Sequence, residues 1–544
     1  MKRKAVAAVL TAVMVASMFT GCGSDNGSSS AKSASAASAA SAANDTVDED
    51  GKVNGIMYQE GLPLVDEGDY TFSIFCDDSS ESGEFIMLDE FKKQTNVDVD
   101  LKIYPYETAT ERLNLDLNSG DYADVIGGWT LSDNAILTYG VNQGVFIPLE
   151  DYFEKYCPNI SAILDLPGVR EKMTAPDGHI YTIPYVCADT TVGYSPYINT
   201  KWLENVGMSM PTTTDEFEAV LKAFKEQDAN GNGDASDEIP FSTDPNNKHI
   251  EAMAGYFGLP MNKLGIAIQN EKVVYGGVSD TYREFLSWFH KLYAEGLVDV
   301  ELYTQDSSTW EGKGNQDLYG VSIAYGSNEF TGIPAAEERG DFDSMPVLNT
   351  DKGGIWLRDT EGFSVYRTQA VITNKAEHPE IICRWFDNAF ALENGIGCNR
   401  GPVGVIVNKE DDGYHAIDTT TLSEEDQEKY SWGNLWPQSL PKYLPVDFEF
   451  VEEHPMYDEK KATEEAYEAN LTKEIIPSYW IDLDKIDTFS DTNTAIKDFF
   501  EQQQAQFVCG ELDIDNDADW QAYVDGMYSL GLEDWVATQG IEED

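Results

Sequence analysis

Residues Pro211 to Pro240 read PTTTDEFEAVLKAFKEQDANGNGDASDEIP, a stretch in which a predicted helix runs directly into a loop rich in acidic and amide side chains. Thr213 stands three residues before Glu216, which is the spacing of a capping box, so a helix is expected to begin here. Four apolar residues then recur at helical spacing and predict one buried face: Phe217, Val220, Leu221 and Phe224. The stretch therefore predicts an amphipathic helix that ends in a polar loop.

The loop over residues 228–239 has the composition of a site for a hard cation. Ca²⁺ takes several oxygen ligands, and an EF-hand-like loop supplies them from alternate positions, with a glycine at the sixth. The sixth position here is Gly233 and the twelfth is Ile239 instead of Glu, so the bidentate acid would be Asp237 or Glu238. The candidate ligands are the oxygen-bearing side chains of the loop: Asp228, Asn230, Asn232, Asp234, Asp237 and Glu238. The alternative interpretation is a polar Asn-Gly turn on the surface.

Length and charge limit the possible functions. The chain has 544 residues, more than one hydrophobic core accommodates, so at least two domains are expected. It has 97 acidic and 36 basic residues, which give a formal net charge of −61. Such a surface repels nucleic acid and anionic membranes, so we expect neither as a partner. The charge also argues mildly against a strongly anionic ligand.

The first 68 residues predict an export signal followed by a tether. Residues 1–21 combine a basic start with a short apolar run, as a signal peptide does. The run ends in Phe19-Thr20-Gly21-Cys22, which resembles a lipoprotein processing site and would leave Cys22 as an N-terminus carrying lipid, including palmitate. Residues 22–68 begin with a Ser/Ala/Gly-rich segment that cannot bury enough surface to fold, which predicts a flexible tether. Secretion after cleavage at another site is the alternative.

The next part of the chain alternates between strand and helix patterns. Apolar alternation predicts strands at 70–75 and 97–103, Asp124-Val-Ile predicts a third, and helices are expected over 84–94 and 108–118. This order predicts an α/β lobe with a largely parallel sheet. Ligands of such sheets gather at the carboxyl ends of the strands. Those ends include Asp77, Asp78 and Trp129.

The chain resembles the bacterial extracellular solute-binding proteins of carbohydrate ABC importers, in the calcium-containing group that includes alginate-oligosaccharide binders. The resemblance runs from about Asp69 to the C-terminus. It rests on the order of several motifs: the Pro211–Pro240 stretch, Ser119-Gly-Asp-Tyr-Ala-Asp124, Gly178-His-Ile-Tyr-Thr-Ile-Pro-Tyr185, Phe507-Val-Cys-Gly510 and Trp520-Gln-Ala-Tyr523.

The resemblance implies a periplasmic-binding-protein-like fold, with two α/β lobes joined by a hinge around an interlobe cleft. Lobe 1 would comprise residues 69–186 plus 363–430, and lobe 2 residues 187–362 plus 431–544. Calcium would be a structural clip in lobe 2, away from the sugar. The implied function is to capture a carbohydrate, most simply an oligosaccharide, and deliver it to membrane permease subunits. The protein would then be a monomer, anchored by lipid at the extracellular face of a bacterial cell membrane.

No catalytic motif stands out in the sequence. The chain contains no H-E-x-x-H, no G-x-S-x-G and no P-loop pattern, so we expect a binding protein and not an enzyme. A glycoside hydrolase needs only two carboxylates, so a secreted hydrolase is one alternative, and an adhesive surface lipoprotein is another. Six scattered cysteines after Cys22 form no C-x-x-C pair, which leaves disulfides and buried thiols both open.

Aromatic residues are the positive signal for sugar binding. Sugar rings stack on aromatic faces, and their hydroxyl groups bond to a few placed polar side chains. The candidate ligand-binding residues lie at predicted loops or strand ends: Asp77, Asp78, Trp129, Tyr185, Trp310, Tyr325, Trp356, Arg358, Trp432 and Trp436. For any single aromatic residue, core packing is an equal alternative. We expect two or three of these rings to line the cleft.

Overall fold

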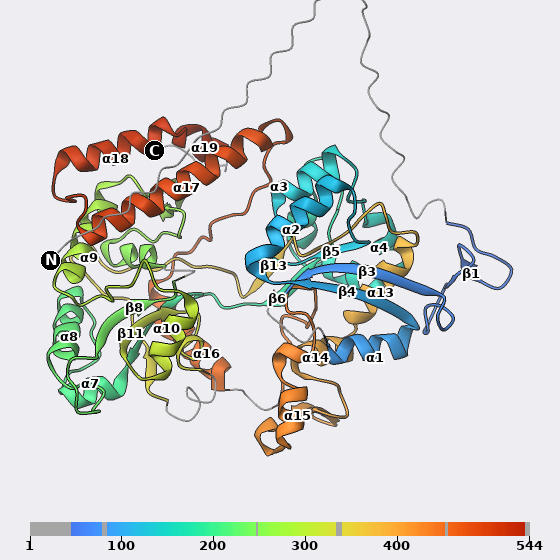
Figure 1. The fold of residues 1–544 in the computed structure, drawn as a ribbon, viewed down its shortest axis with the longest axis horizontal. Helices are drawn as coiled ribbons and strands as arrows, with labels where there is room; N and C mark the ends of the chain where they lie inside the picture. Colours follow the sequence, from blue (N-terminus) through green and yellow to red (C-terminus); the bar gives the residue numbers. More distant parts are fainter. Residues whose placement is uncertain (1–44, 79–83, 246–248, 333–339, 452–454, 539–544) are drawn as a thin grey trace, which may run out of the picture. The chain divides into compact units, whose positions relative to one another are not determined.

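The computed structural model describes residues 45–78, 84–245, 249–332, 340–451 and 455–538. Two four-stranded sheets in this part of the chain have separate hydrophobic cores (Figure 1). We call the part built on the first sheet lobe 1 and the part built on the second lobe 2. This mixed α/β architecture confirms the predicted fold class. The predicted signal peptide and Cys22 lie outside the described residues. The prediction that a flexible tether extends to residue 68 is wrong, because β1 (Lys52–Val53) pairs with β2 (Met57–Tyr58), and Val53, Met57, Leu64 and Val65 are buried in the lobe 1 core.

Lobe 1 contains a sheet with the strand order β14-β5-β3-β4. Its strands are β3 (Tyr70–Asp77), β4 (Val97–Tyr104), β5 (Val125–Gly127) and β14 (Ala370–Ile372). β3 pairs in parallel with β4 and β5, and β14 is antiparallel to β5. Ile74 and Phe75 enter hydrophobic clusters on opposite faces of β3, because successive strand residues alternate between faces. The predicted largely parallel sheet is therefore confirmed.

The helices of lobe 1 come from two separate parts of the chain. They are α1 (Ile86–Thr95), α2 (Tyr106–Ser119), α3 (Asp133–Ala135), α4 (Glu150–Tyr156), α5 (Pro158–Leu164), α6 (Val169–Met173), α13 (Pro379–Ala389) and α14 (Leu392–Arg400). A hairpin of β15 (Val407–Glu410) and β16 (Gly413–Ala416) follows α14.

Lobe 2 contains a sheet with the strand order β12-β7-β11-β8. Its strands are β7 (Ser195–Asn199), β8 (Ile239–Thr243), β11 (Tyr319–Ala324) and β12 (Phe342–Ser344). β11 is buried along its whole length, parallel to β8 and antiparallel to β7. Its helices are α7 (Thr200–Val206), α8 (Thr214–Glu226), α9 (Asp280–Ala294), α10 (Ser307–Asn315), α11 (Asn328–Thr331), α16 (Pro455–Tyr467), α17 (Ile486–Cys509), α18 (Asp517–Ser529) and α19 (Leu532–Thr538).

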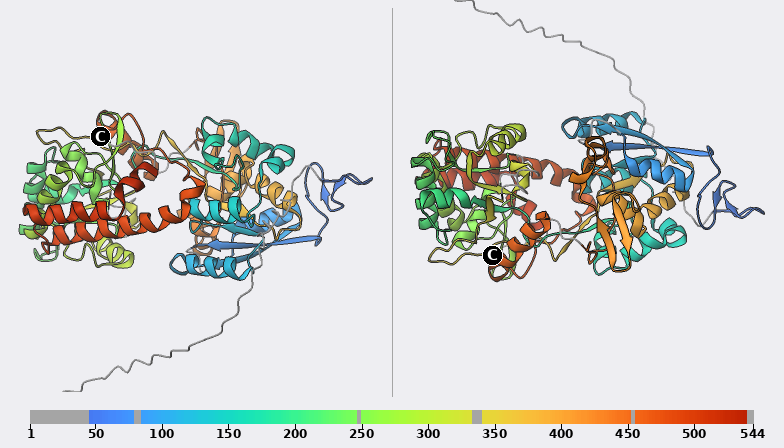
Figure 2. Two further views of the ribbon diagram at one scale, coloured as in Figure 1. Left: turned by 90° about the horizontal axis from the view of Figure 1, so that it is seen from above. Right: turned by 90° about the horizontal axis from the view of Figure 1, so that it is seen from below.

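Helix α8 forms as its sequence predicts. The Oγ1 of Thr213 accepts a hydrogen bond from the backbone N–H of Glu216 at 3.2 Å, so the helix has a side-chain cap. The four predicted core residues are all buried in lobe 2: Phe217, Val220, Leu221 and Phe224. On another side of the same core, α17 packs along α9 and beside α18 and α19 (Figure 2).

Two antiparallel strands connect the sheets. β6 (Tyr185–Ala188) follows the lobe 1 elements and leads to β7, and β13 (Phe363–Tyr366) leads back to β14. In their pairing Tyr185 lies opposite Tyr366, and Cys187 opposite Ser364. The predicted lobe boundaries after residues 186 and 362 therefore fall within β6 and at the start of β13.

One part of the chain belongs to a different core from the one predicted. The predicted boundary places Trp436 and Leu440 in lobe 2, but both pack in the lobe 1 core. The Trp436 ring stacks on Trp385 of α13 with centroids 5.8 Å apart, and it lies 5.3 Å from Phe91 of α1. The boundary at residue 430 is therefore wrong, because the chain stays with lobe 1 for at least ten further residues.

The structure also bears on the state of the cysteines and on membrane-spanning helices. The structure holds six free cysteines, of which Cys76, Cys157, Cys383 and Cys398 are buried, so within the described residues the cysteines are thiols. No helix in the described ranges has both the length and the hydropathy needed to cross a bilayer.

Candidate functional site

Three aromatic rings form a cluster at the crossing strands, which we call the crossing-strand group: Trp129, Tyr185 and Tyr366. Tyr185 and Tyr366 are cross-strand partners, and their rings stack with centroids 5.4 Å apart. Trp129 meets Tyr366 edge-on at 5.3 Å and lies 6.4 Å from Tyr185. The indole of Trp129 is 47% exposed, so this group offers an accessible aromatic surface.

The backbone around Asp77 positions Trp129. Asp77 ends β3, and its two carboxylate oxygens accept hydrogen bonds from the backbone N–H groups of Trp129 at 3.0 Å and Thr130 at 2.6 Å. Gly128 lies between the end of β5 and Trp129 and has φ +134°. A Cβ at this position would lie 2.2 Å from the Asp77 carboxylate. Desolvation raises the pKa of Asp77, while these N–H groups oppose the rise.

The burial of two acids corrects the prediction that they contact a ligand directly. Asp77 is fully buried, and its oxygens are engaged by backbone N–H groups. Asp78 is also buried, and it accepts a hydrogen bond from the backbone N–H of Gln438 at 2.7 Å. Both residues therefore shape the loops at the carboxyl end of β3.

A second aromatic cluster lies on lobe 2 at the carboxyl end of β11. We call it the Tyr325 group: Asp189, Tyr194, His249, Tyr325 and Lys460. The Tyr325 hydroxyl donates to Oδ1 of Asp189 at 3.3 Å, and the Lys460 amine lies 3.8 Å from the ring centroid. Tyr194 packs edge-on against Tyr325 and stacks on His249 at 4.0 Å. Burial lowers the pKa of His249 to about 4, so its ring is neutral near pH 7.

Carboxylates surround the single amine of this group. Lys460 interacts electrostatically with Glu459, Glu329, Asp359 and Asp189, while desolvation lowers its pKa to about 8. Desolvation, with the nearby charge of Asp189, raises the pKa of Asp359 to about 6. Its carboxylate accepts a hydrogen bond from the Gly193 backbone N–H at 2.7 Å. In the described surroundings of Tyr325, four carboxyl groups therefore face the one amine of Lys460.

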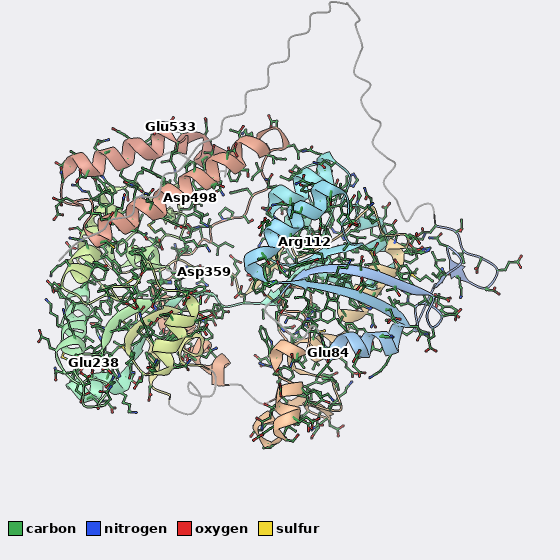
Figure 3. All side chains as sticks on the ribbon, in the orientation of Figure 1. Glu84, Arg112, Glu238, Asp359, Asp498 and Glu533 are labelled. Carbon is green, nitrogen blue, oxygen red and sulfur yellow. The ribbon has the colours of Figure 1, made fainter. Side chains whose placement is uncertain are left out.

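Asp359, labelled in Figure 3, also lines a cavity of about 400 Å³. That volume is within the range of small-molecule sites. The wall includes Asp133, Arg358, Tyr479 and Phe489. Arg358, a predicted ligand residue, has its guanidinium bonded to Glu468 at 3.3 Å and to the backbone carbonyl of Thr472 at 3.1 Å.

The other predicted tryptophans do not join these clusters. Trp310, Trp356 and Trp436 are each buried within a hydrophobic core, so the prediction that they bind ligand is wrong. Trp432 is 58% exposed, and the amine of Lys442 lies 5.1 Å from its ring. Of the predicted aromatic residues, the structure therefore brings Trp129 and Tyr185 together in one group and places Tyr325 in the other.

The sequence does not indicate several residues of these groups, nor Asp359 in the cavity wall. The missed group members are Tyr366, Asp189, Tyr194, His249 and Lys460. Tyr366 lies shortly after the predicted lobe boundary at residue 362, and a register for the two crossing strands would have placed it opposite Tyr185. Lys460 lies on α16, more than a hundred residues after Tyr325, and no local pattern connects the two.

The acidic loop after α8 contains buried oxygens that lack partners. Oδ2 of Asp228 accepts from the backbone N–H of Gly233 at 3.0 Å, and Oε1 of Glu238 accepts from that of Ala229 at 2.9 Å. The second oxygens, Oδ1 of Asp228 and Oε2 of Glu238, are buried without a hydrogen-bond partner. Desolvation raises the pKa of Glu238, which Figure 3 places beside α7 and α8. Two buried carboxylate oxygens without donors are what an oxygen-ligated cation would satisfy.

Hydrogen bonds from amide side chains stabilise the rest of this loop. Asn230 and Asn232 donate to the two oxygens of Asp237, at 3.3 Å and 2.7 Å, and Oδ1 of Asn232 accepts from the Asp234 backbone N–H at 2.7 Å. Asp234 accepts from Ser236, which lowers the pKa of Asp234. All six predicted ligand residues therefore lie in one hydrogen-bonded loop.

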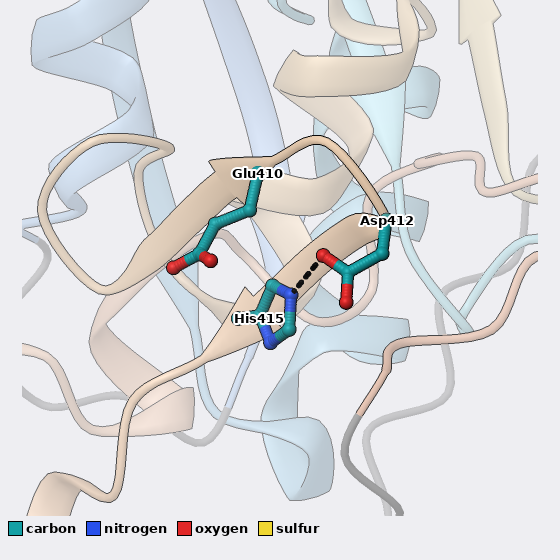
Figure 4. A group of neighbouring side chains, drawn as sticks. All are labelled: Glu410, Asp412 and His415. Atoms are coloured by element: carbon teal, nitrogen blue, oxygen red, sulfur yellow. Dashed lines mark hydrogen bonds and ion pairs between the residues drawn. The ribbon is translucent and has the colours of Figure 1, made fainter.

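A second collection of possible ligand atoms lies on the β15–β16 hairpin. Glu410, Asp412 and His415 each place one such atom within 4.8 Å of the others (Figure 4). The group is largely exposed, and Nε2 of His415 lies 3.0 Å from Oδ1 of Asp412. A hydrogen-bonded pair on a hairpin accounts for this geometry, so we assign no ion to it.

Comparison with known proteins gives concordant results. The model of the family described as bacterial extracellular solute-binding protein matches residues 78–395. The fructooligosaccharide ABC transporter substrate-binding protein FusA of Streptococcus pneumoniae is 32% identical over 411 residues, which cover 73% of this chain and 70% of FusA. Lipoprotein LipO of Bacillus subtilis is 28% identical over 280 residues, 50% of this chain and 52% of LipO.

Solved structures show the same fold. An EF-hand mutant of FusA from S. pneumoniae, in complex with fructo-nystose, aligns with a TM-score of 0.74 and 27% identity over 86% of this chain and 98% of that one. The alginate-binding protein AlgQ2, solved without calcium ion, aligns with a TM-score of 0.70 over 89% of this chain and 99% of that one. At 22% identity the AlgQ2 match shows the fold alone.

Proposed function

Because the chain belongs to the family of bacterial extracellular solute-binding proteins, we propose that it is the substrate-binding component of an ABC importer and captures an oligosaccharide. The observation that carries this proposal is the crossing-strand group, in which the half-exposed indole of Trp129 is held against Tyr185 and Tyr366. A rigid aromatic surface of this kind fits the flat C–H face of a sugar ring. FusA, the similar protein from S. pneumoniae, is named for fructooligosaccharides.

Binding follows from two surfaces on different lobes. The crossing-strand group includes Trp129 of lobe 1, and the Tyr325 group belongs to lobe 2. A ligand that contacts both groups stabilises the conformation in which it can touch both at the same time. The free energy of this stabilisation equals the contribution of the additional contacts. That conformation would then present the ligand to permease subunits of the importer.

Equilibrium binding and product analysis test this function. We expect calorimetric titration with kestose, nystose or another short oligosaccharide to show saturable binding, with the sugar recovered unchanged. Release of new reducing ends would instead support a glycoside hydrolase. Affinity for polymers or host surfaces, without affinity for short soluble sugars, would support an adhesive lipoprotein.

The loop over 228–239 is proposed to hold Ca²⁺ as a structural ion. The partnerless oxygens of Asp228 and Glu238 fit such an ion, and Asn230, Asn232, Asp234 and Asp237 supply further oxygens nearby. The solved FusA variant is an EF-hand mutant, and an EF-hand is the type of loop that residues 228–239 resemble. When bound, the ion would neutralise the buried carboxylates and fix the connection between α8 and β8.

We also propose that the mature chain begins at Cys22 and carries lipid there. The similarity to lipoprotein LipO supports this proposal, together with the sequence pattern of residues 1–21. The segment from Cys22 to the start of the described residues would then tether a monomeric binding protein at the extracellular face of the membrane, since Val53, Met57 and Leu64 already belong to the lobe 1 core. Metabolic labelling with palmitate, lost on Cys22→Ala, tests the anchor.

A further inference from the structure

The exposed ring of Tyr325 lies between carboxylates. Asp189 accepts the hydrogen bond of its hydroxyl at 3.3 Å, and Oε2 of Glu329 accepts from its backbone N–H at 2.9 Å. Asp359 and Glu459 also act on the amine beside the ring. A ligand stacked near Tyr325 would therefore meet hydrogen-bond acceptors that carry negative charge.

Four basic side chains in the described part of the site are engaged by protein groups, and a fifth, Lys263, interacts electrostatically with His249. Lys460 donates to the Gly193 carbonyl at 2.7 Å, and its charge is opposed by four carboxylates. Arg358 bonds to Glu468, and Arg367 forms two bonds to Asp133. Lys442, only 4% exposed, donates to Oε1 of Gln438 at 2.6 Å. Each of these four cationic side chains is bonded to a protein oxygen, whereas a carboxylated ligand is typically held by an arginine fork that is open to it.

From this arrangement we infer that the site selects uncharged oligosaccharides and rejects those whose sugar units carry carboxylates, such as uronate oligomers. The inference rests on the proposed function and adds the charge class of the ligand. Sugar hydroxyl groups can donate to Asp189 and Asp359, whereas a ligand carboxylate has no proton to donate and repels them.

A matched set of saccharides tests the selection. Kestose, nystose, xylo-oligosaccharides and manno-oligosaccharides serve as neutral probes, with oligogalacturonate and oligoalginate of similar length as acidic probes. The best neutral ligand is then oxidised at its primary hydroxyl groups to a uronate, and the methyl ester of that product provides a neutral control with the same skeleton. Calorimetry near pH 7 gives each dissociation constant.

We expect the acid to bind about tenfold more weakly than its methyl ester at low salt, because like charges repel in a partly desolvated site. The ratio should fall as salt rises from about 50 mM to about 500 mM, since salt screens that repulsion. An acid that binds as tightly as its ester, or an oligouronate that binds best in the panel, would overturn the inference and leave the proposed function intact. Absence of binding by every probe, neutral or acidic, would overturn the proposed function and this inference together.

Isosteric variants of two aspartates test whether their charges cause the weaker binding of acidic ligands. Asp359→Asn and Asp189→Asn each remove one charge and keep an oxygen that can accept a hydrogen bond. We expect both to lower the preference for the ester over the acid several-fold, whereas Glu533→Gln, which removes an exposed charge on α19 outside both groups, should not alter that preference. Melting temperatures show whether each variant is folded. An unchanged preference in both folded aspartate variants would contradict a role for these charges.

Discussion

The amine of Lys460 lies 3.8 Å from the centroid of the Tyr325 ring and donates a hydrogen bond to the Gly193 carbonyl at 2.7 Å. Lys460 is on α16, and Tyr325 follows β11, so this contact joins two distant parts of the chain. The cation covers part of the ring, and 37% of Tyr325 remains exposed. The orientation of Tyr325 is thus set by Lys460 on the ring and by Asp189 at the hydroxyl.

Removing either exposed ring should weaken sugar binding. Truncation of a stacking residue at the centre of a binding site costs about 2 kcal/mol, or roughly thirtyfold in affinity. We therefore expect Trp129→Ala and Tyr325→Ala each to raise the dissociation constant by about that factor in calorimetry. Tyr528→Ala on α18, which removes a similarly exposed ring far along the chain, is the control and should leave affinity unchanged. Full affinity in both test variants would place the sugar elsewhere.

The buried amine of Lys442 should make stability rise with pH in the alkaline range. Desolvation lowers the pKa of Lys442 to about 8 in the folded protein, while the unfolded chain keeps the ordinary value of about 10.4. Between these values the unfolded state binds more protons, so the free energy of unfolding increases with pH, by roughly 1 kcal/mol per unit at most. Lys442→Met should flatten this rise and be neutral or stabilising near pH 7.

Chemical denaturation at several alkaline pH values measures that slope. Lys460 has a similar lowered pKa and contributes in the same direction, so the variant should reduce the slope and not abolish it. Lys473→Met provides a control, because this lysine is exposed and its pKa is raised by Glu271. A slope identical to that of the wild type in Lys442→Met would show that this amine does not titrate near pH 8.

Much of the fold could be predicted because it is encoded locally. The apolar alternation at 70–75 and 97–103 and the helical spacing in 214–226 each correspond to an observed element. The lobe boundary after residue 430 could not be predicted in this way. Trp436 belongs to lobe 1 because its ring stacks on Trp385, a contact between residues about fifty positions apart that leaves no periodic signal.

The site was only partly predictable for the same reason. Trp129 and Tyr325 follow strand ends, where ligands of α/β sheets gather, so strand prediction alone indicates them. Trp310 and Trp356 fill cores instead, Trp310 from the buried side of α10 and Trp356 in the lobe 2 core, because large aromatic rings serve core packing as often as ligand contact. Lys460 becomes visible only when tertiary structure places α16 beside Tyr325.

Removing calcium should destabilise the protein more than it weakens sugar binding. An ion present at about a hundred times its dissociation constant stabilises the folded state by about 3 kcal/mol. We therefore expect a chelator to lower the melting temperature by several degrees, because the oxygens of Asp228 and Glu238 are then buried without a partner. Sugar affinity, measured on the chelated protein below its melting temperature, should change less.

Variants of the loop distinguish the effect of losing the bound ion from any other effect of the chelator. Asp228→Asn and Glu238→Gln should abolish the response of the melting temperature to calcium, and in chelator they should melt no lower than the wild type, since a buried unpaired charge has been removed. Asp412→Asn, which alters the acidic group on the β15–β16 hairpin, should respond like the wild type. Chelation that abolished sugar binding at an unchanged melting temperature would contradict a structural role.

Arg367, which follows β13, connects that crossing strand to two other segments. Its Nε donates to Oδ1 of Asp133 at 2.8 Å, its Nη2 donates to the Tyr479 carbonyl at 2.8 Å, and its guanidinium lies 4.1 Å from the centroid of the Trp480 ring. Arg367 is 6% exposed, whereas the Asp133 side chain is 29% exposed, so solvent partly screens the pair. Its loss would leave the Asp133 carboxylate and the Tyr479 carbonyl without a planar donor.

We expect Arg367→Met to lower the free energy of unfolding by about 2 kcal/mol, below the value for a fully buried pair because of that screening. Arg367→Lys should recover only part of the loss, since an ammonium cannot bond to Asp133 and Tyr479 in the same fork or stack on Trp480. A double-mutant cycle with Asp133→Ala, measured by chemical denaturation, should give a coupling energy of about 1 kcal/mol or more. Additive effects of the two changes would mean that the ion pair contributes nothing, and that the bond to the Tyr479 carbonyl and packing on Trp480 account for the effect of Arg367.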